Sequence, residues 1–206
     1  VGGSAEGSVK FRGEELLGAP EKRLRAVRGK EIALVLQSAS SAWNPAVRLE
    51  DQFREAWKAH SKERWEAGLD RLKDTMRRFQ LPTDAGFLRR YPRQVSIGQA
   101  QRLLIAMALL HQPAVLIADE ITSALDAVTQ REVMRCIEET NVRYGAAVLF
   151  ITHTLSLLRG FCHKVAVLHE GRIVESGSME QVLSSPRHEY TRLLLDAAFP
   201  SELALR

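Results

Sequence analysis

The segment from Leu116 to Glu120 constrains this chain most, because an apolar run (Leu-Ile-Ala) ends there in two adjacent carboxylates. A buried strand of a parallel sheet is a continuous apolar run, and its carboxyl end lies where α/β proteins bind ligands. At that edge Asp119 can hold Mg²⁺ while Glu120 orients or deprotonates a water molecule, as nucleotide hydrolysis requires. Alternatively, both acids are structural, and they cap the next helix or pair with a surface arginine.

Apolar and amphipathic segments alternate along the chain. Strand patterns occur at residues 8–11, 31–36, 114–118, 146–152, 164–168 and 172–175, the last two flanking a hairpin turn. Helical patterns occur at residues 48–80, 98–111, 127–143, 179–183 and 188–198, and we expect a loop at residues 38–45. In the third helix, the candidate inward residues are Val128, Val133, Ile137 and Val142. This alternation predicts an α/β fold with a mostly parallel sheet.

The composition indicates a soluble protein with a sizeable core, since 45% of the 206 residues are hydrophobic and 26% are charged. A net charge of +4 is too mild to indicate nucleic acid, so we expect no such partner. Cys136 and Cys162 form neither a disulfide framework nor a metal-ligand spacing. The longest apolar run, residues 103–110, is far shorter than the roughly 18 residues of a membrane span. We therefore expect a cytoplasmic protein that reaches a membrane only through a partner.

Three further motifs carry polar groups at the ends of apolar segments. Gln37 follows one strand, and its amide can both donate to and accept from a metal-bound or nucleophilic water. His153 follows another strand, where an imidazole can donate to a phosphate oxygen. Ser96 is a good N-cap for an apolar helix whose free N–H groups and dipole favour an anion. Taken singly, Gln37 and His153 are better explained as an ordinary loop glutamine and a strand-end histidine, and Ser96 can be the cap of an ordinary helix.

In their order along the chain, these motifs resemble the ATP-binding subunits of ABC transporters. Gln37 resembles the Q-loop, and His153 resembles the switch histidine. Residues 96–102 (Ser-Ile-Gly-Gln-Ala-Gln-Arg) resemble the signature, residues 116–120 resemble Walker B, and residues 123–126 (Ser-Ala-Leu-Asp) resemble the D-loop. The likeness covers nearly the whole chain. It implies an α/β, P-loop NTPase-like nucleotide-binding domain with a mostly parallel sheet and an inserted helical subdomain.

The same resemblance implies ligands and site residues. The ligands are ATP and Mg²⁺, and the expected catalytic residues are Glu120, His153 and Gln37. Asp119 and Gln37 are expected at the metal. Because two such subunits sandwich ATP, a second ABC ATPase subunit is an expected partner, and the expected nucleotide contacts are Ser96, Gly98, Gln99 and Asp126.

A finer resemblance is to the branch that imports oligopeptides, dipeptides and nickel. It rests on Trp43-Asn44-Pro45, on Tyr91-Pro92 before the signature, and on the tail at residues 185–191 (Ser-Pro-Arg-His-Glu-Tyr-Thr). It implies that transmembrane permease subunits contact residues from about 48 to 91. The protein is then expected to be peripheral, on the cytoplasmic face of the inner or plasma membrane.

The chain departs from this family in its phosphate-binding loop. The Gly-x-x-x-x-Gly-Lys-[Ser/Thr] pattern is absent, because Gly29-Lys30 is followed by Glu31 and Leu24 stands where the first glycine belongs. Losing even one preorganised donor costs about 3 kcal/mol of transition-state stabilisation. We therefore expect an N-terminally truncated domain that is inactive alone, consistent with a first residue, Val1, that is not methionine. Ile97 in place of a signature glycine and Ile121 in place of a proline are smaller departures.

The resemblance divides the chain into four expected parts: residues 1–45 (remnant of the N-terminal core), 46–97 (helical subdomain), 98–177 (catalytic core) and 178–206 (C-terminal helical tail). Three functions fit. The first is the ATPase subunit of a peptide- or nickel-type importer. The second is a non-catalytic half that lends its signature to an intact partner. The third, a soluble ABC ATPase of translation or DNA repair, is disfavoured because those proteins usually carry tandem cassettes or long coiled-coil inserts.

Overall fold

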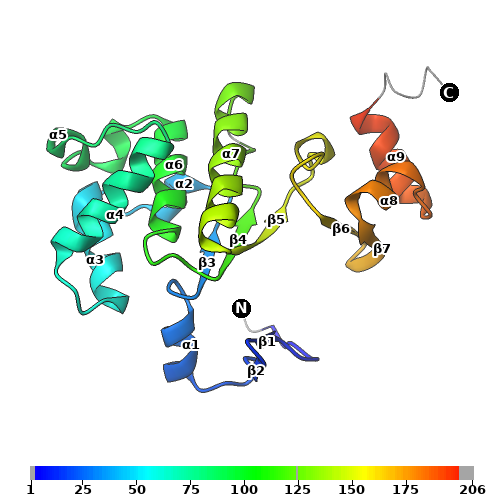
Figure 1. Ribbon diagram of the computed structural model, residues 1–206, viewed down its shortest axis with the longest axis horizontal. Coiled ribbons are helices and arrows are strands. Elements are labelled where there is room, and N and C mark those ends of the chain that lie inside the picture. Colours follow the sequence, from blue (N-terminus) through cyan, green and yellow to red (C-terminus); the bar gives the residue numbers. More distant parts are fainter. Residues whose placement is uncertain (1–2, 124, 200–206) are drawn as a thin grey trace. The chain divides into compact units, whose positions relative to one another are not determined.

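The computed structural model describes residues 3–123 and 125–199, and the chain forms two compact units, residues 1–151 and 152–206 (Figure 1). The first unit contains a three-stranded sheet and most of the helices. The second contains a hairpin and two helices. Within the described residues, no helix combines the length and apolar content of a membrane span.

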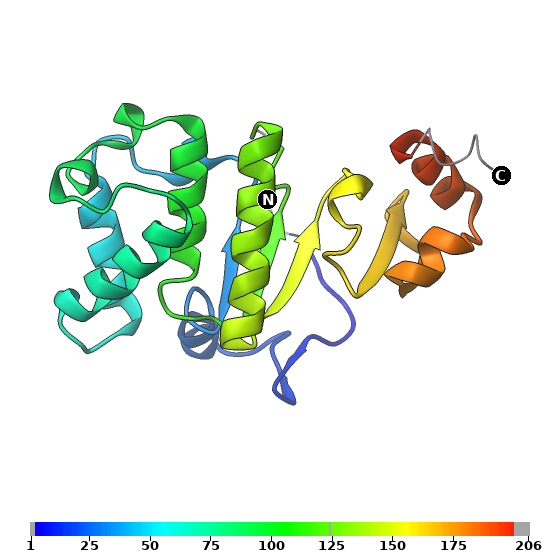
Figure 2. The same cartoon turned by 45° about the horizontal axis from the view of Figure 1, so that its top comes forward.

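The sheet of the first unit is parallel, with the strand order β3 (Ile32–Val35), β4 (Val115–Asp119) and β5 (Ala147–Ile151). Its buried face carries Ala33, Val35, Leu116 and Ala118, each at most 2% exposed. Helices α6 (Ile97–Ala108) and α7 (Ala127–Tyr144) cover this face (Figures 1 and 2). The opposite face is open, because Leu34 and Leu149 are 55% and 54% exposed.

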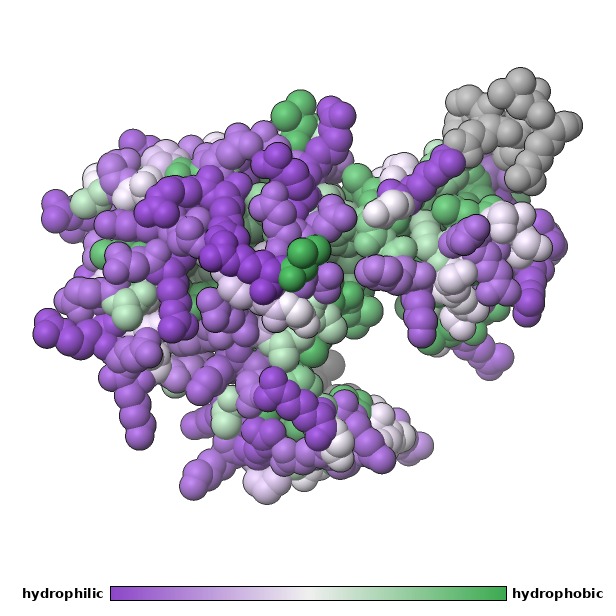
Figure 3. Space-filling view, in the orientation of Figure 1, coloured by the Kyte–Doolittle hydropathy of each residue, from purple (hydrophilic) through white to green (hydrophobic). Residues whose placement is uncertain are grey.

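A helical insert connects β3 to α6. It comprises α2 (Ala39–Ala42), α3 (Leu49–His60), α4 (Trp65–Arg78), α5 (Ala85–Leu88) and the 3₁₀ turn η1 (Pro92–Gln94). Apolar residues at helical spacing form its core, since Leu49, Phe53, Trp57, Leu72 and Met76 are all at most 1% exposed. Its outer surface is mainly hydrophilic (Figure 3).

The segment before β3 has the wrong order of elements for a phosphate-binding loop. A short hairpin of β1 (Lys10–Phe11) and β2 (Glu14–Glu15) leads to α1 (Glu21–Val27), which the sequence pattern did not predict. The chain then turns at Gly29, where φ is +76°, and enters β3. A phosphate-binding loop runs from a strand into a helix. Gly29-Lys30 instead joins a helix to a strand, at the amino end of that strand.

The second unit joins the 3₁₀ turn η2 (Leu155–Leu157) to the hairpin of β6 (Lys164–His169) and β7 (Arg172–Ser178), followed by α8 (Met179–Ser184) and α9 (Glu189–Ala198). The carboxylate of Glu175 accepts the backbone N–H groups of Arg187 and His188 at 2.8 and 3.0 Å. His169 stacks on Tyr190 with 3.8 Å between ring centroids. These contacts hold the tail motif against the hairpin.

The structure confirms the α/β class, the parallel core strands and the hairpin, and it corrects four local predictions. Residues 38–45, expected as a loop, contain the helical turn α2. Residues 48–80 form two helices, since Ser61 adopts an extended backbone after His60 and its hydroxyl accepts the N–H of Glu63. Val128 and Val142 do not face inward but are 59% and 80% exposed, because only the middle of α7 packs on the core. The strand expected at residues 8–11 is limited to its last two residues.

Gly68 lets α4 approach the indole of Trp57. A Cβ atom at Gly68 would lie 2.6 Å from Cδ2 of Trp57, well inside contact distance. The indole is fixed in place, because its Nε1 donates to the carbonyl oxygen of Glu63 at 3.1 Å and its ring is 1% exposed. The helical insert therefore depends on a glycine at this crossing.

We expect Gly68→Ala to lower the free energy of unfolding by about 1–3 kcal/mol, as overpacking does. The measurement is urea unfolding of the full chain. Gly98→Ala is the matched control, because a Cβ there would lie 3.7 Å from Leu125, an ordinary contact. That control should be neutral or gain up to about 1 kcal/mol from helix propensity. Equal stability of Gly68→Ala and the wild type would contradict the packing described.

Two histidines join the insert to the core. The ring of His111 stacks on Trp57 at 5.2 Å, and His60 meets His111 edge-on at 5.4 Å. Burial is the main cause that lowers the pKa of both imidazoles below 6.5, with Lys30 contributing at each and Arg71 at His111. Burial therefore favours the neutral form of both rings.

Because each folded-state pKa lies below 6.5, protonation favours the unfolded chain. The stability from this cluster is complete above pH 6.5 and is lost as the pH falls through the folded pKa values. Urea unfolding at pH 7.5, 6.5 and 5.5 measures this loss, which should shrink in the variant that combines His60→Gln with His111→Gln. An unchanged pH dependence in that variant would show that other groups are responsible.

Candidate functional site

Gln37 and Glu120 meet at the carboxyl edge of the parallel sheet. The register pairs Val35 of β3 with Ala118 of β4, and two more residues along each strand lead to Gln37 and Glu120. Nε2 of Gln37 donates a hydrogen bond of 2.8 Å to Oε2 of Glu120. Two sequence-predicted site residues, distant along the chain, are thus in direct contact where α/β sheets bind ligands.

Glu120 has a strained backbone that is held at both ends. Its φ is +48°, in the left-handed region that costs a non-glycine residue about 1–3 kcal/mol. Its N–H donates to the carbonyl oxygen of Ile151 at 2.9 Å, which ties it to β5. Its own carbonyl oxygen accepts the N–H and the hydroxyl of Ser123 at 3.1 and 2.9 Å. Such over-determined strain is typical of functional positions.

Asp119 is the last residue of β4 and immediately precedes this strained turn. Its carboxylate and the amide oxygen of Gln37 are hard oxygen donors of the kind that Mg²⁺ accepts. The part of the chain that the structure describes has no group of three or more histidine, cysteine, aspartate or glutamate side chains suited to a metal. Because Mg²⁺ is usually held by one or two carboxylates, water and substrate phosphates, these two donors still fit such an ion.

The start of α6 contains three of the predicted nucleotide contacts. Ser96 is its N-cap, as predicted, and its hydroxyl accepts the N–H of Gln99 at 3.2 Å. The side-chain oxygen of Gln99 accepts the N–H of Ser96 at 3.0 Å, which completes a capping box. Gly98 has room for a Cβ, so packing within the chain does not require glycine there. Both capping side chains are held ready at a helix N-terminus, and their contact with nucleotide stays a prediction.

Asp126 caps α7, the helix that follows the two strand-end acids. Its carboxylate accepts the N–H groups of Val128 and Thr129 at 3.0 Å each and the hydroxyl of Thr129 at 2.7 Å. The backbone and hydroxyl hydrogen bonds from Thr129 lower the pKa of Asp126. The helix is therefore capped by Asp126 and not by Asp119 or Glu120, so a capping role does not explain those two acids.

His153 follows β5 and belongs to the second unit. Glu120 belongs to the first unit. The contact of His153 with a phosphate beside Glu120 therefore stays a prediction.

An apolar groove lies beside the start of α6. Its volume is about 470 Å³, and its lining includes Trp43, Pro45, Pro92, Val95 and Ile97. Trp43 is 4% exposed and its Nε1 donates to the carbonyl oxygen of Ala100 at 3.1 Å, so it ties the segment after Gln37 to α6. Sequence reasoning missed this role, although a tryptophan in an expected loop was a usable signal.

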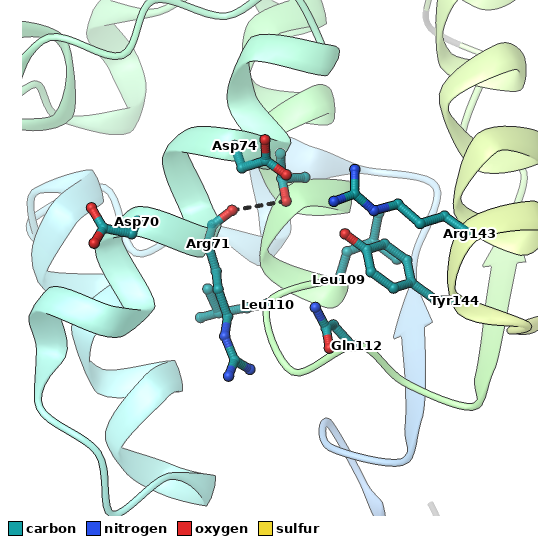
Figure 4. Close-up of a pocket in the computed structure, with 9 residues that line it drawn as sticks. Asp70, Arg71, Asp74, Leu109, Leu110, Gln112, Arg143 and Tyr144 are labelled. Atoms are coloured by element: carbon teal, nitrogen blue, oxygen red, sulfur yellow. Dashed lines mark hydrogen bonds between the residues drawn. The ribbon is translucent and has the colours of Figure 1, made fainter.

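A second hollow of about 310 Å³ lies between α4 and the ends of α6 and α7 (Figure 4). Its lining includes Asp74, Gln112, Arg143 and Tyr144. Asp74 already pairs with Arg78 at 2.7 Å. None of the predicted site residues lines this hollow, so it is not the candidate site.

Known proteins identify the family of this chain. The family described as ABC transporter matches residues 3–123, more than half of the chain. The chain belongs to the ABC transporter family. Solved structures support the fold: this ABC chain matches a dimeric bacterial ABC transporter cassette, MJ0796, with a TM-score of 0.74 at 24% identity, over 84% of this chain and 74% of the other. It also matches cbiO1 of Clostridium perfringens, with a TM-score of 0.73 at 23% identity, over 98% and 76% of the two chains.

Curated relatives of this ABC chain carry transport names. It is 38% identical to "Peptidoglycan transport ATP-binding protein YejF" of Agrobacterium fabrum, over 93% of this chain and 35% of the relative. It is 37% identical to "Dipeptide transport ATP-binding protein DppD" of Lactococcus lactis, over 93% of this chain and 55% of the relative. The ABC chain thus spans between about a third and somewhat over half of these relatives' lengths.

Proposed function

We propose that this chain is the ATP-binding, ATP-hydrolysing part of an ABC importer of the peptide, dipeptide or nickel class. The single observation that carries the proposal is the Gln37–Glu120 hydrogen bond of 2.8 Å at the carboxyl edge of the sheet. The transport names of the relatives support the substrate class. Coupling of hydrolysis to transport then follows from contact with membrane subunits.

In this proposal each side chain at the sheet edge has its own role in ATP hydrolysis. Glu120 accepts a proton from, or polarises, the water that attacks the terminal phosphate, and Gln37 orients that water through its amide. Asp119 and the amide oxygen of Gln37 hold Mg²⁺, which neutralises developing charge when it is bound. His153 donates to a phosphate oxygen and responds to its loss.

The start of α6 serves a second subunit. Ser96, Gly98 and Gln99 present a helix N-terminus, which favours the phosphates of a nucleotide held by a second ABC ATPase subunit. Asp126, at the start of α7, is proposed to contact the same nucleotide. The dimeric form of the MJ0796 cassette supports this pairing.

The groove beside α6 is proposed to receive the permease. Its lining includes Pro45 and Pro92, which flank in sequence the segment 48–91 that the family resemblance assigns to the permease, and Ile97 in the lining is 69% exposed. An apolar groove with an exposed apolar rim suits an amphipathic segment of a partner. The chain would then be peripheral, on the cytoplasmic face of the membrane, without a nucleic-acid partner.

The alternative is a non-catalytic half that supplies its signature to an intact partner. Gly29-Lys30 is not a phosphate-binding loop in either case, because this pair lies at the amino end of β3, whereas Glu120 follows the carboxyl end of β4. The reading frame upstream of Val1 separates the two proposals. An in-frame phosphate-binding loop favours the catalytic subunit, and a stop codon favours the half-site. Micromolar ATP binding by the chain alone would contradict the view that it needs further donors.

In the assembled transporter, Glu120→Gln should reduce ATP turnover by about 10²- to 10⁴-fold, the usual contribution of a general base. The measurement is steady-state phosphate release at saturating ATP. Glu139→Gln is the matched control, since Glu139 lies on α7 and pairs only loosely with Arg135, at 3.6 Å. Full activity in Glu120→Gln would refute the assigned role.

Ile97→Asp should reduce co-purification of the chain with its permease by about tenfold or more, because a charge would have to be buried in the apolar groove. The assay omits nucleotide, so that contacts across a nucleotide sandwich do not contribute. Val142→Asp is the control, as an 80% exposed valine elsewhere on the first unit. Equal assembly of the Ile97 variant and the wild type would remove the groove from the proposal.

A further inference from the structure

The hydroxyl of Ser123 touches both partners of the Gln37–Glu120 pair. Its Oγ donates to the carbonyl oxygen of Glu120 at 2.9 Å. It also accepts from Nε2 of Gln37, the same nitrogen that donates to Glu120, at 3.4 Å. One hydroxyl thus links the backbone of the acid to the side chain of its amide partner, which comes from a different strand.

This contact acts on the strained part of the site. Glu120 has a φ of +48°, and its carbonyl oxygen receives both the N–H and the hydroxyl of Ser123. The N–H alone would close the turn. The hydroxyl adds a second donor to that carbonyl and also fixes the amide of Gln37, so it restrains the direction in which the carboxylate points.

We propose that Ser123 is a positioning residue, which holds Glu120 and Gln37 in one arrangement through its hydroxyl. The proposal rests on the proposed ATP hydrolysis, because it needs Glu120 to act on water. Ser123 touches neither nucleotide nor water in this role. It acts by keeping the carboxylate and the amide at a fixed separation before the reaction. A small misplacement of these reacting groups would lower the rate.

The first test measures ATP turnover by the assembled transporter. Ser123→Ala should lower kcat by about tenfold to a hundredfold while KM changes by less than about twofold, because positioning acts on the reacting geometry. Ser123→Thr keeps the hydroxyl at an exposed position and should retain kcat within about twofold. Unchanged kcat in the alanine variant, or a loss confined to KM, would overturn the proposal.

The matched control is Ser184→Ala. Ser184 is also exposed, and its hydroxyl likewise donates to a carbonyl three residues earlier, that of Gln181, at 3.5 Å. It lies on α8, in the second unit. If Ser123 only stabilised its turn, both variants would lower the unfolding midpoint slightly and keep full kcat at temperatures well below it, which contradicts positioning.

A second readout needs no nucleotide. The side-chain amide signals of Gln37 in the NMR spectrum of the full chain should move in Ser123→Ala and in Glu120→Gln, and they should stay in place in Ser184→Ala. If the wild type fails to hydrolyse ATP, the proposed function fails. The NMR readout still shows whether the Ser123 hydroxyl contacts the amide of Gln37. If the Gln37 amide signals have the same chemical shifts in Ser123→Ala as in the wild type, the positioning role is overturned, whatever the ATPase activity.

Discussion

Parallel pairing of β3, β4 and β5 is the constraint on which the candidate site depends. The ladder pairs Val35 with Ala118, and Ala118 with Phe150, so all three strands end at the same edge. Side chains alternate between the faces of a sheet, so a slip of one residue would exchange the buried and open faces of a strand. The contact of Gln37 with Glu120 therefore requires both the strand order and its register.

The helical insert is coupled to this sheet by a few polar anchors. Trp43 donates to α6, and the guanidinium of Arg102 on α6 donates to the carbonyl oxygen of Phe79 at 2.9 Å, beyond the end of α4. Arg102 also lies 3.6 Å from the carboxylate of Glu132 on α7. These contacts fix the start of α6 and the apolar groove relative to the sheet edge.

The local sequence pattern predicted the helices and strands that have the clearest hydrophobic pattern. It failed where the burial of a side chain depends on segments that are distant in the sequence. The run before Asp119 is a strand, and Ser96 caps its helix, because continuous apolar runs and capping residues act over a few positions. Val142 has the spacing of a core residue yet is 80% exposed, since the end of α7 extends past the elements it packs on. Leu34 and Leu149 lie in continuous apolar runs, yet they are 55% and 54% exposed on the open face of the sheet. Those outcomes depend on which segments meet, which periodicity does not encode.

The sequence by itself determined the chemical groups, their order and the family, because the acids, the glutamine and the capped helix start are written in short motifs. Tertiary structure alone decided that Gln37 and Glu120, 83 residues apart, share a hydrogen bond. It also decided that Glu120 adopts a left-handed backbone and that the hydroxyl of Ser123 contacts both the backbone carbonyl of Glu120 and the side-chain amide of Gln37. The physical reason is that hydrogen bonds between strands and turns depend on register and long-range packing. Local composition specifies neither.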